Sequence, residues 1–273
     1  MNYCNIKNGQ TIPFNTIPVM EYPLFRKQII QLLQNKDCHC LNYFGYPQKG
    51  NQLQLICCIG NDTTSEIYVF SFLHDLNAHS ILDSITREHF GMHIFEREIS
   101  EKFGIEFAGL PWNKPVRYPF DRFNKSANFK NYPFYHIESP ELHEVGVGPI
   151  HAGIIEPGHF RFICNGEKVL HLEIHQGYQH RGIESLFLQK KSLLERTILA
   201  ESIAGDSVAA NTTAFSMLME SMGNIPISKQ SSLIRTIAIE LERAAIHTGD
   251  LSALCTDIAY QEGSAVLQGL RTI

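Results

Sequence analysis

The spacing of apolar residues predicts a small α+β unit in the first part of the chain. Residues 22–35 repeat apolar positions at helical spacing and predict an amphipathic helix. Two apolar runs of strand character follow at residues 52–59 and 66–73. Residues 93–103 carry a mixed charged face and stop at Gly104, the residue type that best tolerates the C-cap of a helix.

The middle of the chain predicts a surface linker and then a hairpin. Residues 121–142 are polar, aromatic and interrupted by proline, which favours a linker over the surface. Two alternating runs, residues 159–164 and 167–175, flank Asn165-Gly166, which is a two-residue hairpin signal.

The last part of the chain predicts long helices. Residues 192–222 and 228–259 have helical patterns, with Ser228 suited to the N-cap of the second. Small residues on one side of these helices favour a bundle. We therefore expect an α+β fold: a two-layer module over residues 1–120, a linker over 121–142, and a hairpin-plus-helix domain over 143–273.

Composition excludes several classes of function. The net charge of −5 argues against a nucleic-acid partner, and no basic run suggests direct binding to anionic lipid. The first residues lack the apolar core of a signal peptide, and no apolar run is long enough to span a membrane.

The seven cysteines favour reduced thiols, because their odd number has no paired framework. Cys38-His39-Cys40 and Cys57-Cys58 resemble fragments of a metal site. Both lie in apolar, strand-like runs, where burial as small hydrophobic residues is the simpler interpretation.

Candidate functional residues are most concentrated between residues 148 and 184. Candidate groups in this short segment include four of its five histidines, one carboxylate in a Pro-Gly turn and one arginine, namely His151, His159, His175, His180, Glu156 and Arg181. Apolar residues precede Glu156, so a cavity location would raise the pKa of its carboxyl group and make it a proton carrier near neutral pH. The alternative is an exposed turn acid without a role.

This segment resembles the opening of the large subunit shared by nickel-iron hydrogenases and the quinone-reducing part of respiratory complex I. The hydrogenase-4 and formate hydrogenlyase branch is the most similar. Residues 95–119 resemble the signature of the 30-kilodalton subunit of complex I, with Glu96-Arg97-Glu98 before Phe103-Gly104-Ile105 and with Leu110-Pro111 where the family has His-Pro. The resemblance implies that this helix docks the module onto its neighbours; a solvated helix face is the alternative.

The resemblance assigns roles to residues of the hairpin segment. Glu156, with Gly158-His159, resembles the Glu-Gly-His motif whose glutamate passes protons to and from the metal site. His180 and Arg181 resemble the pair that faces an iron-sulfur cluster held by a separate small subunit. A helix-start ion pair between Arg181 and Glu184 is the simpler alternative.

The family's nickel ligands have no counterpart here. Its first Cys-x-x-Cys pair aligns with Ala204 and Ser207, neither of which supplies a thiolate. A second pair does not appear before Ile273, which suggests that the C-terminal half is lost or supplied by another chain. We therefore expect no nickel and no other cofactor bound by this chain.

Quinone chemistry as in complex I is only partly supported. The tyrosine of that site aligns with Gly205, and its turn histidine aligns near Glu156. His247 and Asp257 resemble a His…Asp pair that couples the site to proton movement, although Asp257 could equally be a satisfied helix carboxylate.

The sequence thus predicts a redox-arm subunit of a membrane-attached, complex I-related oxidoreductase without its own nickel-iron centre. Its expected partners are an iron-sulfur small subunit, membrane antiporter-like subunits and a chain completing the C-terminal half. It would lie on the cytoplasmic side of the inner membrane. Alternatives are a non-catalytic structural subunit or remnant, an NADH-quinone oxidoreductase subunit, and an intact hydrogenase.

Overall fold

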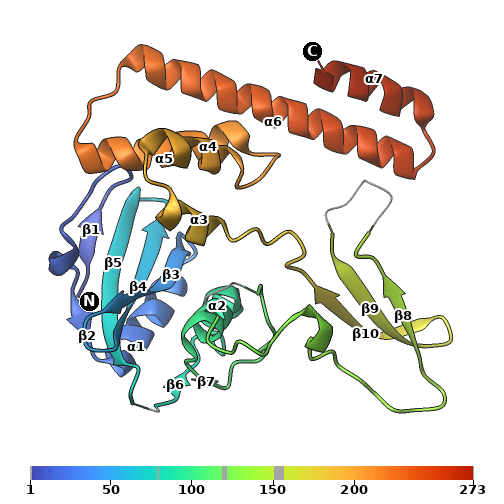
Figure 1. Cartoon of the computed structure of the whole chain (residues 1–273), viewed down its shortest axis with the longest axis horizontal. Coiled ribbons are helices and arrows are strands. Elements are labelled where there is room, and N and C mark those ends of the chain that lie inside the picture. The colour runs from blue at the N-terminus through green and yellow to red at the C-terminus, as the bar shows by residue number, and fades with distance from the viewer. Residues whose placement is uncertain (1, 79, 119–121, 151–156, 273) are drawn as a thin grey trace. The chain divides into compact units, whose positions relative to one another are not determined.

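The computed structural model describes residues 2–78, 80–118, 122–150 and 157–272. The chain divides into two compact units, Met1–His180 and Arg181–Ile273. Strands and helices are both abundant, which confirms the α+β prediction (Figure 1). The predicted domain boundaries near residues 120 and 143 stay a prediction.

A mixed sheet forms the first part of the N-terminal unit. Its hydrogen-bonded order is β1-β5-β4-β3, and β2 pairs in parallel with β5. The strand bounds are Cys4–Ile6 (β1), Val19–Met20 (β2), Cys38–Gln48 (β3), Gln52–Asn61 (β4) and Glu66–Asp75 (β5). The predicted runs at 52–59 and 66–73 are thus confirmed as the two adjacent strands β4 and β5.

Helix α1 (Tyr22–Leu33) covers one face of this sheet, as predicted, with Pro23 in its first turn (Figure 1). Its Phe25 and Ile29 are completely buried against Leu53, Leu55 and Phe70 of the sheet. The cysteine runs lie in β3 and β4, where Cys38 and Cys57 are buried and Cys40 and Cys58 are half-buried.

Helix α2 (His93–Phe103) begins after a 3-10 turn, η2 (Phe90–Met92), and ends at Gly104, whose φ of +74° is the predicted left-handed C-cap. The solvated face considered for Glu96-Arg97-Glu98 is not what forms. Glu96 is completely buried and Arg97 nearly so. A buried charge requires compensating hydrogen bonds, and both side chains have them.

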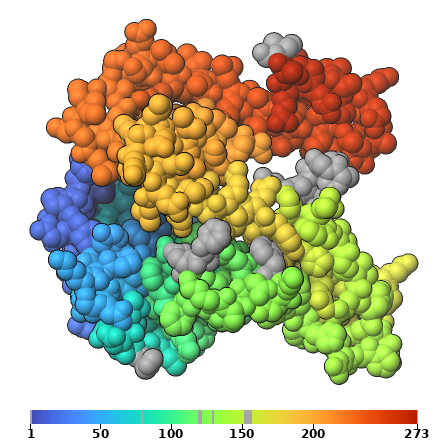
Figure 2. All heavy atoms as spheres, in the orientation of Figure 1, coloured from blue at the N-terminus to red at the C-terminus, as the bar shows by residue number. Residues whose placement is uncertain are grey.

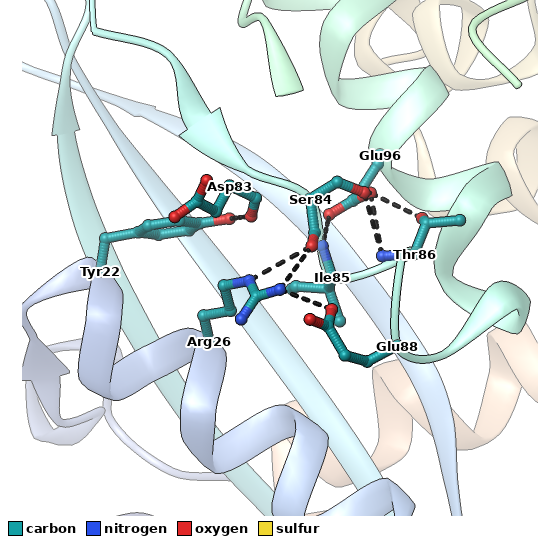
Figure 3. A network of polar contacts seen from close by, with 8 residues as sticks. All are labelled: Tyr22, Arg26, Asp83, Ser84, Ile85, Thr86, Glu88 and Glu96. Carbon is teal, nitrogen blue, oxygen red and sulfur yellow. Dashed lines mark hydrogen bonds and ion pairs between the residues drawn. The ribbon is translucent and has the colours of Figure 1, made fainter. Parts of the chain in front are cut away.

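The carboxylate of Glu96 binds residues 84–86, which lie between β5 and α2 (Figure 3). Its Oε1 accepts the Ile85 N–H at 2.6 Å, and its Oε2 accepts the hydroxyl groups of Ser84 and Thr86, each at 2.6 Å. Helix α1 reaches the same segment from the other side. Tyr22 donates its hydroxyl to the Asp83 carbonyl at 2.5 Å, and Arg26 donates to the Ser84 carbonyl at 2.9 Å.

The chain that follows β7, from residue 109 to residue 118, is called the tail after α2, and Arg97 and Glu101 of that helix hold it. Strand β7 (Phe107–Ala108) itself pairs in parallel with β6 (Leu82–Asp83). Arg97 donates to the carbonyls of Lys114, at 2.7 Å, and Pro115, at 3.1 Å. Glu101 accepts the Val116 N–H at 2.8 Å and pairs with Arg122 at 2.7 Å. Helix α2 therefore sets the path of the chain on both sides.

A second, three-stranded antiparallel sheet follows, with the order β10-β9-β8. The strands are His143–Val147 (β8), His159–Asn165 (β9) and Lys168–His175 (β10), and a 3-10 turn, η3 (Phe129–Asn131), precedes them. The β9–β10 hairpin is confirmed, but Asn165 pairs with Lys168, so the loop residues are Gly166 and Glu167. Gly166 has a φ of +56°, which explains why glycine is needed there.

The C-terminal unit is entirely helical over its described residues. Its helices are Ile183–Gln189 (α3), Leu193–Glu201 (α4), Val208–Gly223 (α5), Lys229–Asp257 (α6) and Gln261–Thr272 (α7). Ser228 caps α6 by accepting the Ser231 N–H at 3.0 Å, as predicted. The single helix expected over 192–222 is instead two helices, broken by the residues between Glu201 and Val208, which include Gly205.

Helix α5 starts without help from its own N-cap side chain, Ser207. The carboxylate of Glu242 in α6 accepts the N–H groups of Ala209 and Ala210 at 2.7 and 3.0 Å. It thereby satisfies two of the amides that every helix N-terminus leaves open. This contact fixes the position of the loop before α5 relative to α6.

Replacing Glu96 tests whether its carboxylate holds the 84–86 segment. We expect Glu96→Ala to lower the free energy of unfolding by roughly 3 kcal/mol, because buried donors lose their acceptor. Glu88→Ala, in the same network but with a half-exposed carboxylate, should have a small effect. Urea titration of the two variants measures this, and equal losses would contradict the assignment.

Candidate functional site

The predicted site residues of the hairpin segment lie at the end of the three-stranded sheet. His159 opens β9, is half-buried, and its Nδ1 lies 3.3 Å from the Gly148 carbonyl oxygen. Its cross-strand partner is His175, the last residue of β10. His151 and Glu156 lie outside the described residues, so the proposed environment of Glu156 stays a prediction.

His175 is the most enclosed titratable group here, with 2% of its surface exposed. Its ring stacks on Tyr132, with centroids 3.9 Å apart, and lies edge-on to Phe134. The Tyr178 hydroxyl is 3.3 Å from its Nδ1. Burial, with a contribution from His159, lowers the pKa of His175 to about 4, so the imidazole is neutral at physiological pH.

A buried carboxylate lies two residues earlier on the same face of β10. Glu173 is 5% exposed, and its Oε2 accepts the Tyr135 N–H at 2.7 Å. Its Oε1 pairs with Lys114 Nζ at 3.1 Å. The sheet is therefore joined to both the tail after α2 and the segment after η3, and an imidazole and a carboxylate are enclosed between them.

His180 and Arg181 follow directly, at the boundary of the two units. The His180 N–H closes a turn onto the Gly177 carbonyl at 3.2 Å, and α3 begins two residues later, as predicted. Arg181 is exposed and donates from Nη2 to the Ile203 carbonyl at 2.8 Å. That contact joins the start of α3 to the loop before α5, within the C-terminal unit.

The residues at the family's nickel-ligand positions do not fit such a centre. Ala204 and Ser207 lie in the loop before α5 rather than on a helix, in a turn where the Ser207 N–H donates to the Ala204 carbonyl at 3.1 Å. A methyl group and a hydroxyl group offer no soft ligand. Cys255 is the single cysteine of this unit, and it lies on α6, outside this turn.

His247 and Asp257 both lie on α6, ten residues apart, and both are exposed. Their distance along the helix separates them by nearly three turns, so they form no contiguous site in this chain. Asp257 is the last residue of α6 and is not enclosed by the apolar residues around it.

Sequence reasoning named His175 but missed its enclosure together with Tyr132 and Glu173. The alternation of β10 did contain a signal, because residues 171, 173 and 175 share one face of a strand. Two of those positions hold polar groups that the structure buries. The partner rings on the segment after η3 could not be found, since that segment has no periodicity.

Comparison with known proteins gives a consistent set of relatives. No family model matches the chain. It is 27% identical over 185 residues to hydrogenase-4 component G of Escherichia coli strain K12, which covers 62% of the chain and 33% of the relative. It is 27% identical over 187 residues to formate hydrogenlyase subunit 5 of the same organism, with the same coverage.

A third relative is named as a subunit of NADH-quinone oxidoreductase. The NADH-quinone oxidoreductase C/D protein of Phocaeicola vulgatus is 28% identical over 198 residues, covering 62% of the chain and 38% of the relative. The chain is thus similar, at moderate identity, to members of a complex I-related hydrogenase large-subunit-like family. It spans about a third of the length of these curated relatives.

Within this large-subunit-like chain, the stability should depend on pH through His175. Its pKa is lowered from 6.5 to about 4 in the folded protein, so the unfolded chain binds more protons between these values. Stability should therefore be complete above pH 6.5 and fall on acidification toward pH 4, by at most about 3 kcal/mol from this group.

Urea unfolding of the wild type and two variants at pH 7.5 and pH 5 measures that dependence. His175→Phe keeps a stacking ring but cannot titrate, and should reduce the difference between the two pH values. His171→Phe, on the same strand and half-exposed, is the matched control and should leave it unchanged. A pH dependence identical in all three proteins would show that His175 is not the group responsible.

Proposed function

We propose that the chain is a subunit of a membrane-attached, complex I-related oxidoreductase of the hydrogenase-4 type, without a nickel-iron centre of its own. The observation that carries this proposal is the surface of the C-terminal unit. Apart from Ala200, the buried side chains described in its helices belong to serines. Many of its large apolar side chains are instead exposed, which isolated soluble proteins avoid.

The exposed apolar side chains follow the length of the helices. On α6 they include Leu241, Leu251 and Leu254, which are 52–66% exposed, and Ile258 just beyond it is 75% exposed. The atoms of α6 and α7 are those drawn in orange and red in Figure 2. Such surface is typical of subunit interfaces that bury it on assembly. The described helices include none long and apolar enough to cross a bilayer.

The partners follow from the relatives, which are named as a component or subunit of hydrogenase, formate hydrogenlyase and NADH-quinone oxidoreductase assemblies. We propose an iron-sulfur small subunit next to His180 and Arg181, membrane antiporter-like subunits, and a further polypeptide segment that covers the exposed helices. The chain would then lie on the cytoplasmic side of the inner membrane, attached through these partners.

In the active form of this proposal, the chain moves protons next to a partner's cluster. Glu156 and His159 would carry protons at the end of the three-stranded sheet, and His247 and Asp257 would do so on α6. His175 stays neutral beside His159 and so adds no positive charge that would oppose protonation there. The electron donor and acceptor, whether NADH, quinone or another couple, would bind to partners.

A non-catalytic structural subunit is the second proposal. The loop before α5 favours it, because Ala204 and Ser207 supply no thiolate and Cys255, the cysteine of the C-terminal unit, lies on α6 outside this loop. The exposure of His247 and Asp257 also favours it, since neither is enclosed as a proton-transfer group would be. Turnover of the assembled complex with Glu156→Gln separates the two proposals: slower turnover favours the relay, and unchanged turnover favours the structural role.

The assembly proposal predicts co-purification. A tagged chain isolated from its host's membranes should bring down an iron-sulfur protein, detectable by iron and acid-labile sulfide. Leu254→Glu should lower the yield of that partner, because an interface cannot solvate the added charge. Gln230→Glu adds the same charge at an exposed polar position of α6 and should not. A monomeric wild-type chain without partners would end the proposal.

The absence of a nickel centre is a separate prediction. Elemental analysis of the native complex should find no nickel on this chain, and the complex should neither take up nor evolve hydrogen. The reason is that a serine hydroxyl is a harder and far less acidic ligand than a thiolate. Stoichiometric nickel on this chain would contradict the alignment of Ala204 and Ser207 and would favour an intact hydrogenase.

A further inference from the structure

A polar cavity of about 760 Å³ lies beside α2, and Lys114 in its wall also pairs with Glu173 of the second sheet. Its wall comes from α2, from the tail that follows it and from the segment before η3. Its charged lining consists of four cations and two carboxylates: Arg97, Lys114, Arg122, Lys125, Glu101 and Glu106. Lys114 also pairs with Glu173 outside the lining, at 3.1 Å, so four cations face three carboxylates and one positive charge is in excess.

Arg97 is the unusual member of this set. It is 7% exposed, and its N–H groups donate hydrogen bonds to the carbonyl oxygens of Lys114 and Pro115 and to the His93 ring. The Trp112 ring lies over the guanidinium, 4.6 Å from its carbon. Among the described residues no carboxylate pairs with it. Three hydrogen bonds use three of its five N–H groups, so two remain for a ligand.

A buried guanidinium without a counter-ion is costly, because carbonyl oxygens and a ring compensate only part of its lost hydration. Burial does lower the pKa of Arg97, with Glu101 acting in the opposite direction. An anion in the cavity would supply the missing negative charge at this position.

Arg122 adds a second open donor on the same wall. Its guanidinium pairs with Glu101 at 2.7 Å, and its Nη1 also donates to the Arg117 carbonyl at 2.9 Å. Its Nε is buried and has no hydrogen-bond partner within the described part of the chain. Buried donors of this kind are rare in folded proteins, and a ligand is one ordinary explanation.

We propose that this cavity binds the phosphate group of a small phosphomonoester. Two guanidinium groups with open N–H donors match the geometry of phosphate oxygens. The negative charge of a phosphate group would offset the excess positive charge of the lining. The volume exceeds that of phosphate alone and lies within the usual range for small-molecule sites. The hydroxyl and amide groups of Ser100 and Asn113 line the rest and suit a polar body.

The chain provides its own reporter for the test. Trp112 is the sole tryptophan of the protein and touches Arg97, so its fluorescence should change when an anion binds. Inorganic phosphate and glycerol 3-phosphate are titrated into the full chain at constant ionic strength. Vesicles of phosphatidate, a lipid with a phosphomonoester headgroup, form a separate arm that distinguishes a lipid from a free ligand.

Two variants of equal charge locate the site. Ser100→Glu places a carboxylate in the cavity and should weaken binding by about tenfold or more, because like charges then face each other. Ile94→Glu adds the same charge on a partly exposed position of α2 outside the lining and should bind as the wild type does. Asn113→Glu repeats the block from the tail, should Ser100→Glu fail to fold by circular dichroism.

Each outcome of these titrations either supports or overturns the proposal. Saturable binding of glycerol 3-phosphate, lost in the cavity variants and kept in Ile94→Glu, supports the proposal. Binding to the vesicles alone would assign the site to a lipid headgroup and overturn the free ligand. No saturable response to any probe, or equal binding by all variants, would overturn the site itself. None of these results depends on the assembly proposed above.

Discussion

The N-terminal unit depends on charged side chains that point inward from one helix. Glu96, Arg97 and Glu101 are buried on α2, and each binds backbone groups of a segment with no regular structure of its own. A buried carboxylate or guanidinium is tolerated only when its hydrogen bonds are made, so these segments have little freedom to take another path. The tail then carries Lys114 to Glu173 in β10 and thereby fixes the second sheet.

This arrangement gives the Glu-Arg-Glu signature a physical meaning within the chain itself. Of Glu96, Arg97 and Glu98, only Glu98 has a substantially exposed carboxylate, and it pairs with Arg117 at 2.6 Å. A docking role at the surface would therefore depend on Glu98. The neutral His175 and the paired Glu173 are consequences of the same enclosure. They lie under the aromatic segment after η3, whose Pro133 carbonyl accepts from Lys114 of the tail.

Regular elements could be predicted because their periodicity is local. The helix at α1, strands β4 and β5, the hairpin and the cap at Ser228 all followed from spacing and turn residues. Two features were not local. The burial of Glu96 depends on Ser84 and Thr86, ten or more residues away, and the break before α5 is stabilised by Glu242, more than thirty residues later in α6. The enclosure of His175 required rings from a segment without any pattern.

The uncovered helices of the C-terminal unit also determine how such a protein behaves in a cell. A partner that covered these apolar side chains would add to the stability of that unit through mass action. Chains made in excess of that cover would expose the same surfaces that recruit chaperones and proteases, so the level of the protein would follow the supply of its neighbours. Abundance would then be set by stoichiometry, rather than by the rate at which the chain is synthesised.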